Sequence, residues 1–60
     1  MNEKLYSALK ETAEEINSRN KELGFYAIRK VSALSANSPL EKLIRCGNDL
    51  MVIAKKLESK

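Results

Sequence analysis

The 60-residue sequence contains no histidine and no tryptophan, and it has one cysteine, one proline and two glycines. A single cysteine cannot form an internal disulfide, and without histidine the usual Cys/His zinc site is missing. Two isolated glycines cannot build a Walker or dinucleotide-binding phosphate loop. We therefore expect neither an enzyme nor a protein that holds a cofactor or a metal ion.

Long hydrophobic runs are missing as well. No stretch of about 18 uncharged apolar residues occurs, so we expect no membrane-spanning helix. Glu3 and Lys4 near the start, with no long apolar run after them, do not resemble a signal peptide, which favours a cytoplasmic location. In that reducing compartment Cys46 is expected to be a small buried hydrophobe, the alternatives being an intermolecular disulfide or a reactive thiol.

Apolar residues recur at helical spacing in the first part of the chain. Leu9, Ile16 and Leu23 lie seven residues apart and predict an amphipathic helix over about residues 2–23. Gly24 directly follows the last of them, and a glycine in the left-handed conformation is a common helix stop. The first helix is therefore expected to end at Gly24.

Polar residues stand at both ends of this predicted helix. Asn2 is expected to cap its start. Arg19 and Asn20 interrupt the apolar stripe near its end, which leaves two interpretations. Either the stripe is narrow and Arg19 reaches solvent, or the two polar residues set the register with a partner helix.

A shorter helix is predicted over about residues 25–36. Phe25, Ile28, Val31 and Leu34 recur every three residues, although such residue types also suit a strand. A strand would need a partner, and no other segment reads as one, so we favour the helix.

The last helix is predicted over about residues 39–58, with its start marked by the tetrad Ser38 to Glu41. Ser38 suits the N-cap, Pro39 the first helical position, and Glu41 the return bond of a capping box. Gly47 marks either a close approach of another helix or a break, and the uninterrupted phase of the apolar positions favours a continuous helix. The apolar face of this segment is wide, which suggests burial from more than one side.

These features predict an all-α fold in which residues 1–60 form a single small domain: two long amphipathic helices with a short middle helix. A chain of this length buries only about 60% of its unfolded surface, which makes a lone core marginal. We therefore expect a homo-oligomeric helical bundle. The residues expected at the oligomer interface are Leu9, Ile16, Leu23, Leu43, Gly47, Leu50, Ala54 and Leu57.

The net charge of +3 is distributed unevenly, because the second half of the chain is basic and the first half is not. A basic half favours an acidic protein surface or nucleic acid as partner. Residues 29–46 also fit a helix-turn-helix in part. A third, weaker hypothesis is a small anionic ligand bound near Tyr26, Arg29 and Lys30. The candidate interaction residues are Tyr26, Arg29, Lys30, Lys42 and Arg45.

The most economical interpretation is a non-enzymatic protein-interaction module that self-associates and acts as adaptor, inhibitor or regulator of a larger partner protein. The alternative is a small helix-turn-helix-like DNA-binding regulator that uses the basic second half. Binding to a membrane surface is disfavoured, because acidic residues dilute the positive charge of the last segment.

Overall fold

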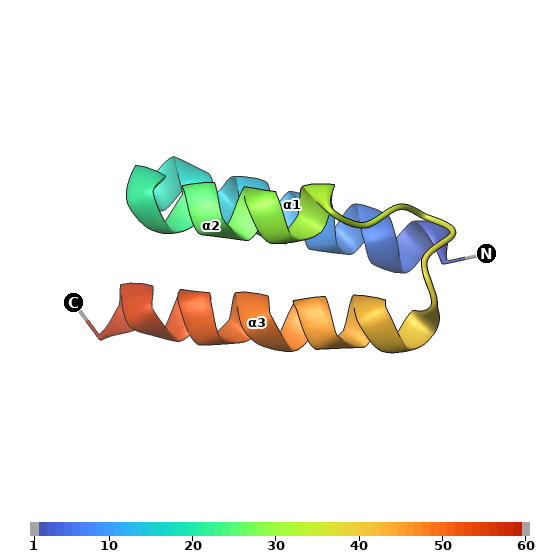
Figure 1. Ribbon diagram of the computed structural model, residues 1–60. Helices are drawn as coiled ribbons and strands as arrows, with labels where there is room; N and C mark the ends of the chain where they lie inside the picture. Colours follow the sequence, from blue (N-terminus) through green and yellow to red (C-terminus); the bar gives the residue numbers. More distant parts are fainter. Residues whose placement is uncertain (1, 60) are drawn as a thin grey trace.

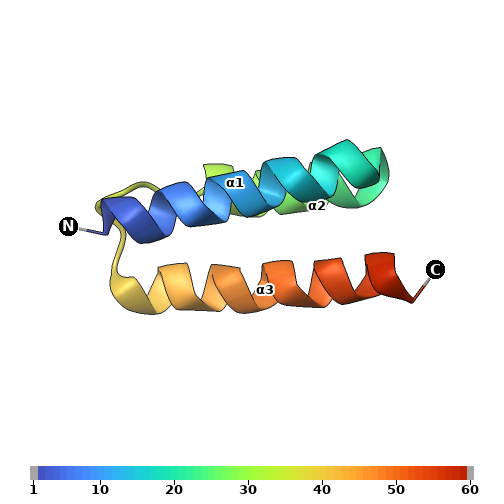
Figure 2. The same ribbon diagram turned by 180° about the vertical axis from the view of Figure 1, so that it is seen from behind.

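The computed structural model describes residues 2–59, and these form three helices: α1 (Glu3–Arg19), α2 (Lys21–Ser32) and α3 (Leu40–Glu58). The helices run up, down and up along one long axis, with α1 beside α2 and α3 packed across both (Figure 1 and Figure 2). The bundle measures 36 × 16 × 16 Å. The all-α prediction is confirmed, and the middle segment is a helix rather than a strand.

The boundary between α1 and α2 lies at Asn20, where the backbone is extended with φ −153° and ψ 111°. The Asn20 amide donates to the Ile16 carbonyl at 2.9 Å, and its side-chain oxygen accepts from the Leu23 amide at 3.1 Å. One residue therefore ends α1 and caps α2. The predicted boundary at Gly24 is wrong, since Gly24 lies inside α2 and has no positive φ. The polar interruption at Arg19 and Asn20 marks the end of a helix.

Gly24 serves a different purpose, which is to let α1 and α2 approach closely. It is buried in the first turns of α2. A Cβ atom at this position would collide with the Asn17 backbone and side chain on α1. Only glycine lacks that atom, so the spacing of the two helices at this crossing depends on it.

The connection between α2 and α3 begins earlier than predicted, because α2 ends at Ser32 rather than near residue 36. The Ser38 hydroxyl accepts from the Ser35 amide at 2.9 Å, and so it closes a turn within the connection. The predicted capping box is wrong: α3 starts at Leu40 with Pro39 at the N-cap and no side-chain cap. The Pro39 carbonyl accepts the first α-helical hydrogen bond, from the Leu43 amide at 3.3 Å, and also a bond from the Lys42 amide at 3.0 Å.

Asn2, the N-cap residue of α1, uses its side chain to tie the connection to the start of that helix. Its backbone amide donates to the Ala36 carbonyl at 3.2 Å, and its side-chain Nδ2 donates to the Ser38 carbonyl at 3.1 Å. Asn2 does occupy the predicted N-cap position of α1, where its carbonyl accepts from the Tyr6 amide at 2.9 Å, but its side chain makes no cap hydrogen bond to the helix. The bonds to Ala36 and Ser38 hold the connection against the first turn of the bundle.

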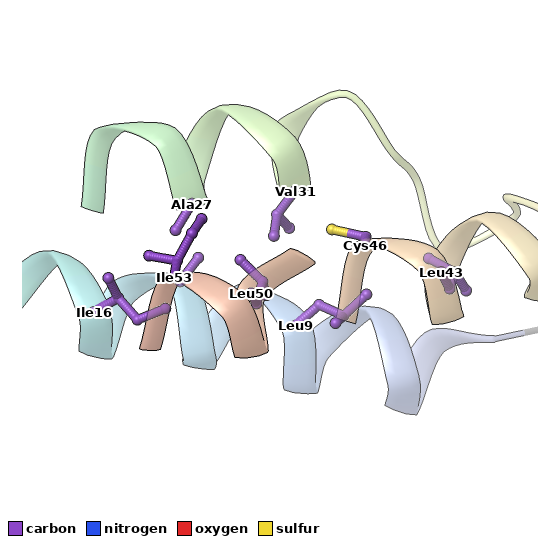
Figure 3. Close-up of a cluster of buried hydrophobic side chains, with 9 residues drawn as sticks. Leu9, Ile16, Ala27, Val31, Leu43, Cys46, Leu50 and Ile53 are labelled. Carbon is purple, nitrogen blue, oxygen red and sulfur yellow. The ribbon is translucent and has the colours of Figure 1, made fainter. Parts of the chain in front are cut away.

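The core lies between α3 and the pair formed by α1 and α2. α3 runs through Gly47 without a break, which confirms the continuous helix. The side chains of the core meet between the helices in Figure 3. They are Leu9, Ala13 and Ile16 from α1, Ala27 and Val31 from α2, and Leu43, Cys46, Leu50 and Ile53 from α3.

The two glycines are expected to respond oppositely to alanine. Gly24→Ala should lose about 1–3 kcal/mol of unfolding free energy, because the new methyl group meets backbone that cannot rotate away. Gly47→Ala is the matched control, since its methyl group would lie 3.4 Å from Leu9 Cδ2, an ordinary contact. It should gain up to about 1 kcal/mol from helix propensity. Urea denaturation at a protein concentration low enough to keep the chain monomeric measures both, and equal effects would contradict this account of Gly24.

Asn20→Ala should lower the free energy of unfolding by about 1 kcal/mol, because the amide of Leu23 then loses its acceptor. Asn20→Asp keeps an oxygen at the same position and should recover most of the loss. Thermal denaturation of the two variants tests this, and an equal loss in both would show that the cap contributes nothing.

Candidate interaction surfaces

The basic residues predicted for interaction gather on the α2 and α3 side of the bundle. Lys30, Lys42 and Arg45 line one shallow hollow between the two helices. Tyr26, Arg29 and Lys30 line a second, adjoining hollow on α2. The structure therefore places all five predicted residues on one continuous face, with Lys30 shared between the two hollows.

Acidic and aromatic groups already engage part of this basic face. Lys30 Nζ lies 3.5 Å from Asp49 Oδ2, with both side chains about half exposed. The Arg29 guanidinium stacks over the Phe25 ring at 5.6 Å, and Phe25 meets Tyr26 edge to face at 6.0 Å. Exposed ion pairs of this kind contribute little stability. Their effect is to lower the positive potential that an anion would encounter.

Helices α2 and α3 lie side by side and antiparallel (Figure 1). A helix-turn-helix needs two helices that cross at about 90–120° and are joined by about 3–4 residues. Here the connection runs from residue 33 to residue 39, and the two helices run nearly along the same direction in Figure 1. The partial match over residues 29–46 therefore does not form that motif.

Six of the eight residues expected at an oligomer interface are used inside a single chain. The side chains of Leu9, Ile16, Leu43 and Leu50 are buried in its core, and Leu23 and Leu57 pack against that core. These residues need no second copy to bury them, because α3 covers the apolar stripes of α1 and α2 within the same chain. Gly47 and Ala54, the remaining two, are only partly buried and lie on the neighbouring row of α3.

That neighbouring row leaves three large apolar side chains of α3 exposed along one face of the helix. We call it the outer seam and define it as Leu40, Ile44, Gly47, Met51 and Ala54. The side chains of Leu40, Ile44 and Met51 are 52%, 52% and 60% exposed. In the sequence, this surface was visible only as the unusual width of the apolar face predicted for residues 39–58. Periodicity alone did not separate the outer seam from the buried row beside it.

Cys46 belongs to the buried row and faces the core (Figure 3). Burial raises the pKa of its thiol above the ordinary value of 9.0, Asp49 raises it further, and Lys30 partly opposes the shift. A higher pKa leaves less thiolate at neutral pH, and the thiolate is the nucleophile. This arrangement supports the buried-hydrophobe interpretation of Cys46 over a reactive thiol.

Within residues 2–59, no cluster of acidic and cysteine side chains has the arrangement of a metal site. In the same range, none of the helices combines the length and the apolar character that crossing a bilayer requires. Comparison with protein-family profiles, with curated proteins and with solved structures finds no match to this chain. Its function must therefore be argued from its own residues.

The raised pKa of Cys46 predicts how stability depends on pH. The folded state holds the thiol proton more tightly than the unfolded state, so stability is full below the ordinary pKa of 9.0 and falls as pH rises above it. Urea denaturation across that range should show wild type losing more stability than Cys46→Ala. Parallel curves for the two proteins would contradict the assigned shift.

Proposed function

We propose that this chain is a small non-enzymatic protein-interaction module, which self-associates and acts as adaptor, inhibitor or regulator of a larger partner protein in the cytoplasm. Its working surface is the outer seam of α3. The proposal concerns helix-to-helix recognition and requires no bound cofactor.

The single observation that supports this function most is the exposure of Leu40, Ile44 and Met51 along one face of a continuous helix. A few isolated exposed apolar residues are normal on a protein surface. Here, however, they follow one another at helical spacing, with the small residue Gly47 between Ile44 and Met51. An aligned apolar row on a helix is the kind of surface that binds another helix.

The alternative is the DNA-binding regulator, and the clustering of Lys30, Lys42 and Arg45 in one hollow favours it. The carboxylate of Asp49 in that hollow and the antiparallel course of α2 and α3 weigh against it. Salt-dependent retention on duplex DNA separates the two functions. DNA binding requires retention at low salt that Lys42→Glu weakens, whereas an interaction module retains its binding when Lys42 is replaced.

Solution mass tests self-association directly. At micromolar concentrations wild type should sediment above its monomer mass of 6.8 kDa. Ile44→Lys should shift the chain toward monomer by roughly a hundredfold in the dissociation constant, because a charge replaces an apolar side chain in both copies. Ile44 is already 52% exposed, so the monomer of this variant should still fold.

Val52→Lys is the matched control, because Val52 is 56% exposed on the same helix but lies outside the outer seam. Its sedimentation should resemble that of wild type. A wild-type chain that is folded and strictly monomeric would contradict the proposed self-association. Equal effects of Ile44→Lys and Val52→Lys would contradict the choice of surface.

A further inference from the structure

We infer that the partner on the outer seam is the α3 helix of a second copy of this chain, packed antiparallel about a two-fold axis near the middle of the helix. This inference rests on the proposed function and specifies its first partner. It commits to one direction and one register of the two helices.

The spacing of the outer seam is that of a coiled-coil seam. Its residues recur at alternating intervals of four and three, from Leu40 to Ala54. The buried row, which begins at Leu43 and ends at Leu57, has the same alternation. Such a heptad repeat is how one helix keeps a constant face toward another. α3 thus carries two adjacent seams, and its own chain occupies the buried one, whose side chains Leu43, Cys46, Leu50 and Ile53 are drawn in Figure 3.

Side-chain size favours the antiparallel direction. From Ile44 onward, large and small residues alternate along the outer seam: Ile44 and Met51 are large, and Gly47 and Ala54 are small. In one antiparallel register Ile44 opposes the partner's Ala54, and Met51 then opposes the partner's Gly47. Ile44 and Met51 thus each meet a small residue, and pairing large with small side chains is how packed cores avoid voids. A parallel pair would set Gly47 against the partner's Gly47 and leave a gap.

Charge complementarity selects the same register. Glu41, Asn48 and Lys55 flank the seam on its exposed side, one in each heptad. In the antiparallel register Glu41 lies beside the partner's Lys55, and the two-fold axis repeats that pair. Asn48 lies beside the partner's Asn48 near the axis. Flanking residues of this kind set the partner and the direction in coiled coils.

The exposed carboxylate is available for that contact. Glu41 makes only a loose pair with Arg45 at 3.9 Å, and its side chain is 86% exposed. Antiparallel pairing also sets the positive end of each helix dipole near the negative end of the other, whereas parallel pairing aligns like ends. Size, charge and dipole therefore agree on one arrangement of the two copies.

Charge reversal tests the register, because Glu41 and Lys55 cannot touch within one chain. They are two heptads apart on α3, or about 21 Å. Glu41→Lys and Lys55→Glu should each raise the dimer dissociation constant about tenfold at low ionic strength, since two pairs become repulsive. The double variant, and an equimolar mixture of the two single variants, should return to within about threefold of wild type.

Lys56→Glu is the control, because it makes the same change in net charge next to Lys55 but off the flank of the seam. Analytical ultracentrifugation gives the dissociation constants, and circular dichroism verifies that each variant is helical. A mixture that stays as weak as the single variants overturns the antiparallel register. The proposed function survives that result if wild type still dimerises and Ile44→Lys disrupts the dimer. A monomeric wild type overturns both.

Discussion

The close approach of α1 and α2 at Gly24 is the constraint on which the rest of the bundle depends. Because Gly24 has no side chain, its backbone packs directly against Asn17. This contact brings the apolar stripes of the two helices near enough to form one apolar surface, and Leu43 and Leu50 of α3 are fully buried in the core formed there. With a wider spacing, a single third helix would not cover both stripes.

The helical class and the continuity of α3 could be predicted from the sequence, because both depend on local periodicity. The boundary between the first two helices could not. Leu9, Ile16 and Leu23 have perfect heptad spacing, yet Leu23 belongs to α2. The information was present in Asn20, a residue that suits helix ends, but Gly24 gave a stronger stop signal. What decided the outcome was contact with Asn17, and such a contact is invisible in a linear pattern.

Similar reasoning applies to the candidate surfaces. The basic residues of α2 and α3 were predicted as a group, and they do lie together, because antiparallel neighbours bring residues 26–30 and 42–45 to one face. The apolar residues were predicted as one broad face, whereas the fold divides them into a buried row and the outer seam. That division depends on the angle from which α1 and α2 approach α3. Periodicity gives the width of a face but does not assign its parts to different neighbours.

The anchoring of the connection by Asn2 has a consequence for the order of folding. α1 and α2 are adjacent along the chain, so the hairpin they form requires only local contacts and should assemble first. α3 arrives last, and its entry point is held by the Ala36 and Ser38 carbonyls that bind Asn2, at the opposite end of the hairpin from Gly24. We therefore expect α3 to pack onto the hairpin from its tethered N-terminal end, so that residue 43 enters the core before residue 53. During synthesis, the apolar surface formed by α1 and α2 would therefore stay exposed to solvent until α3 has been made.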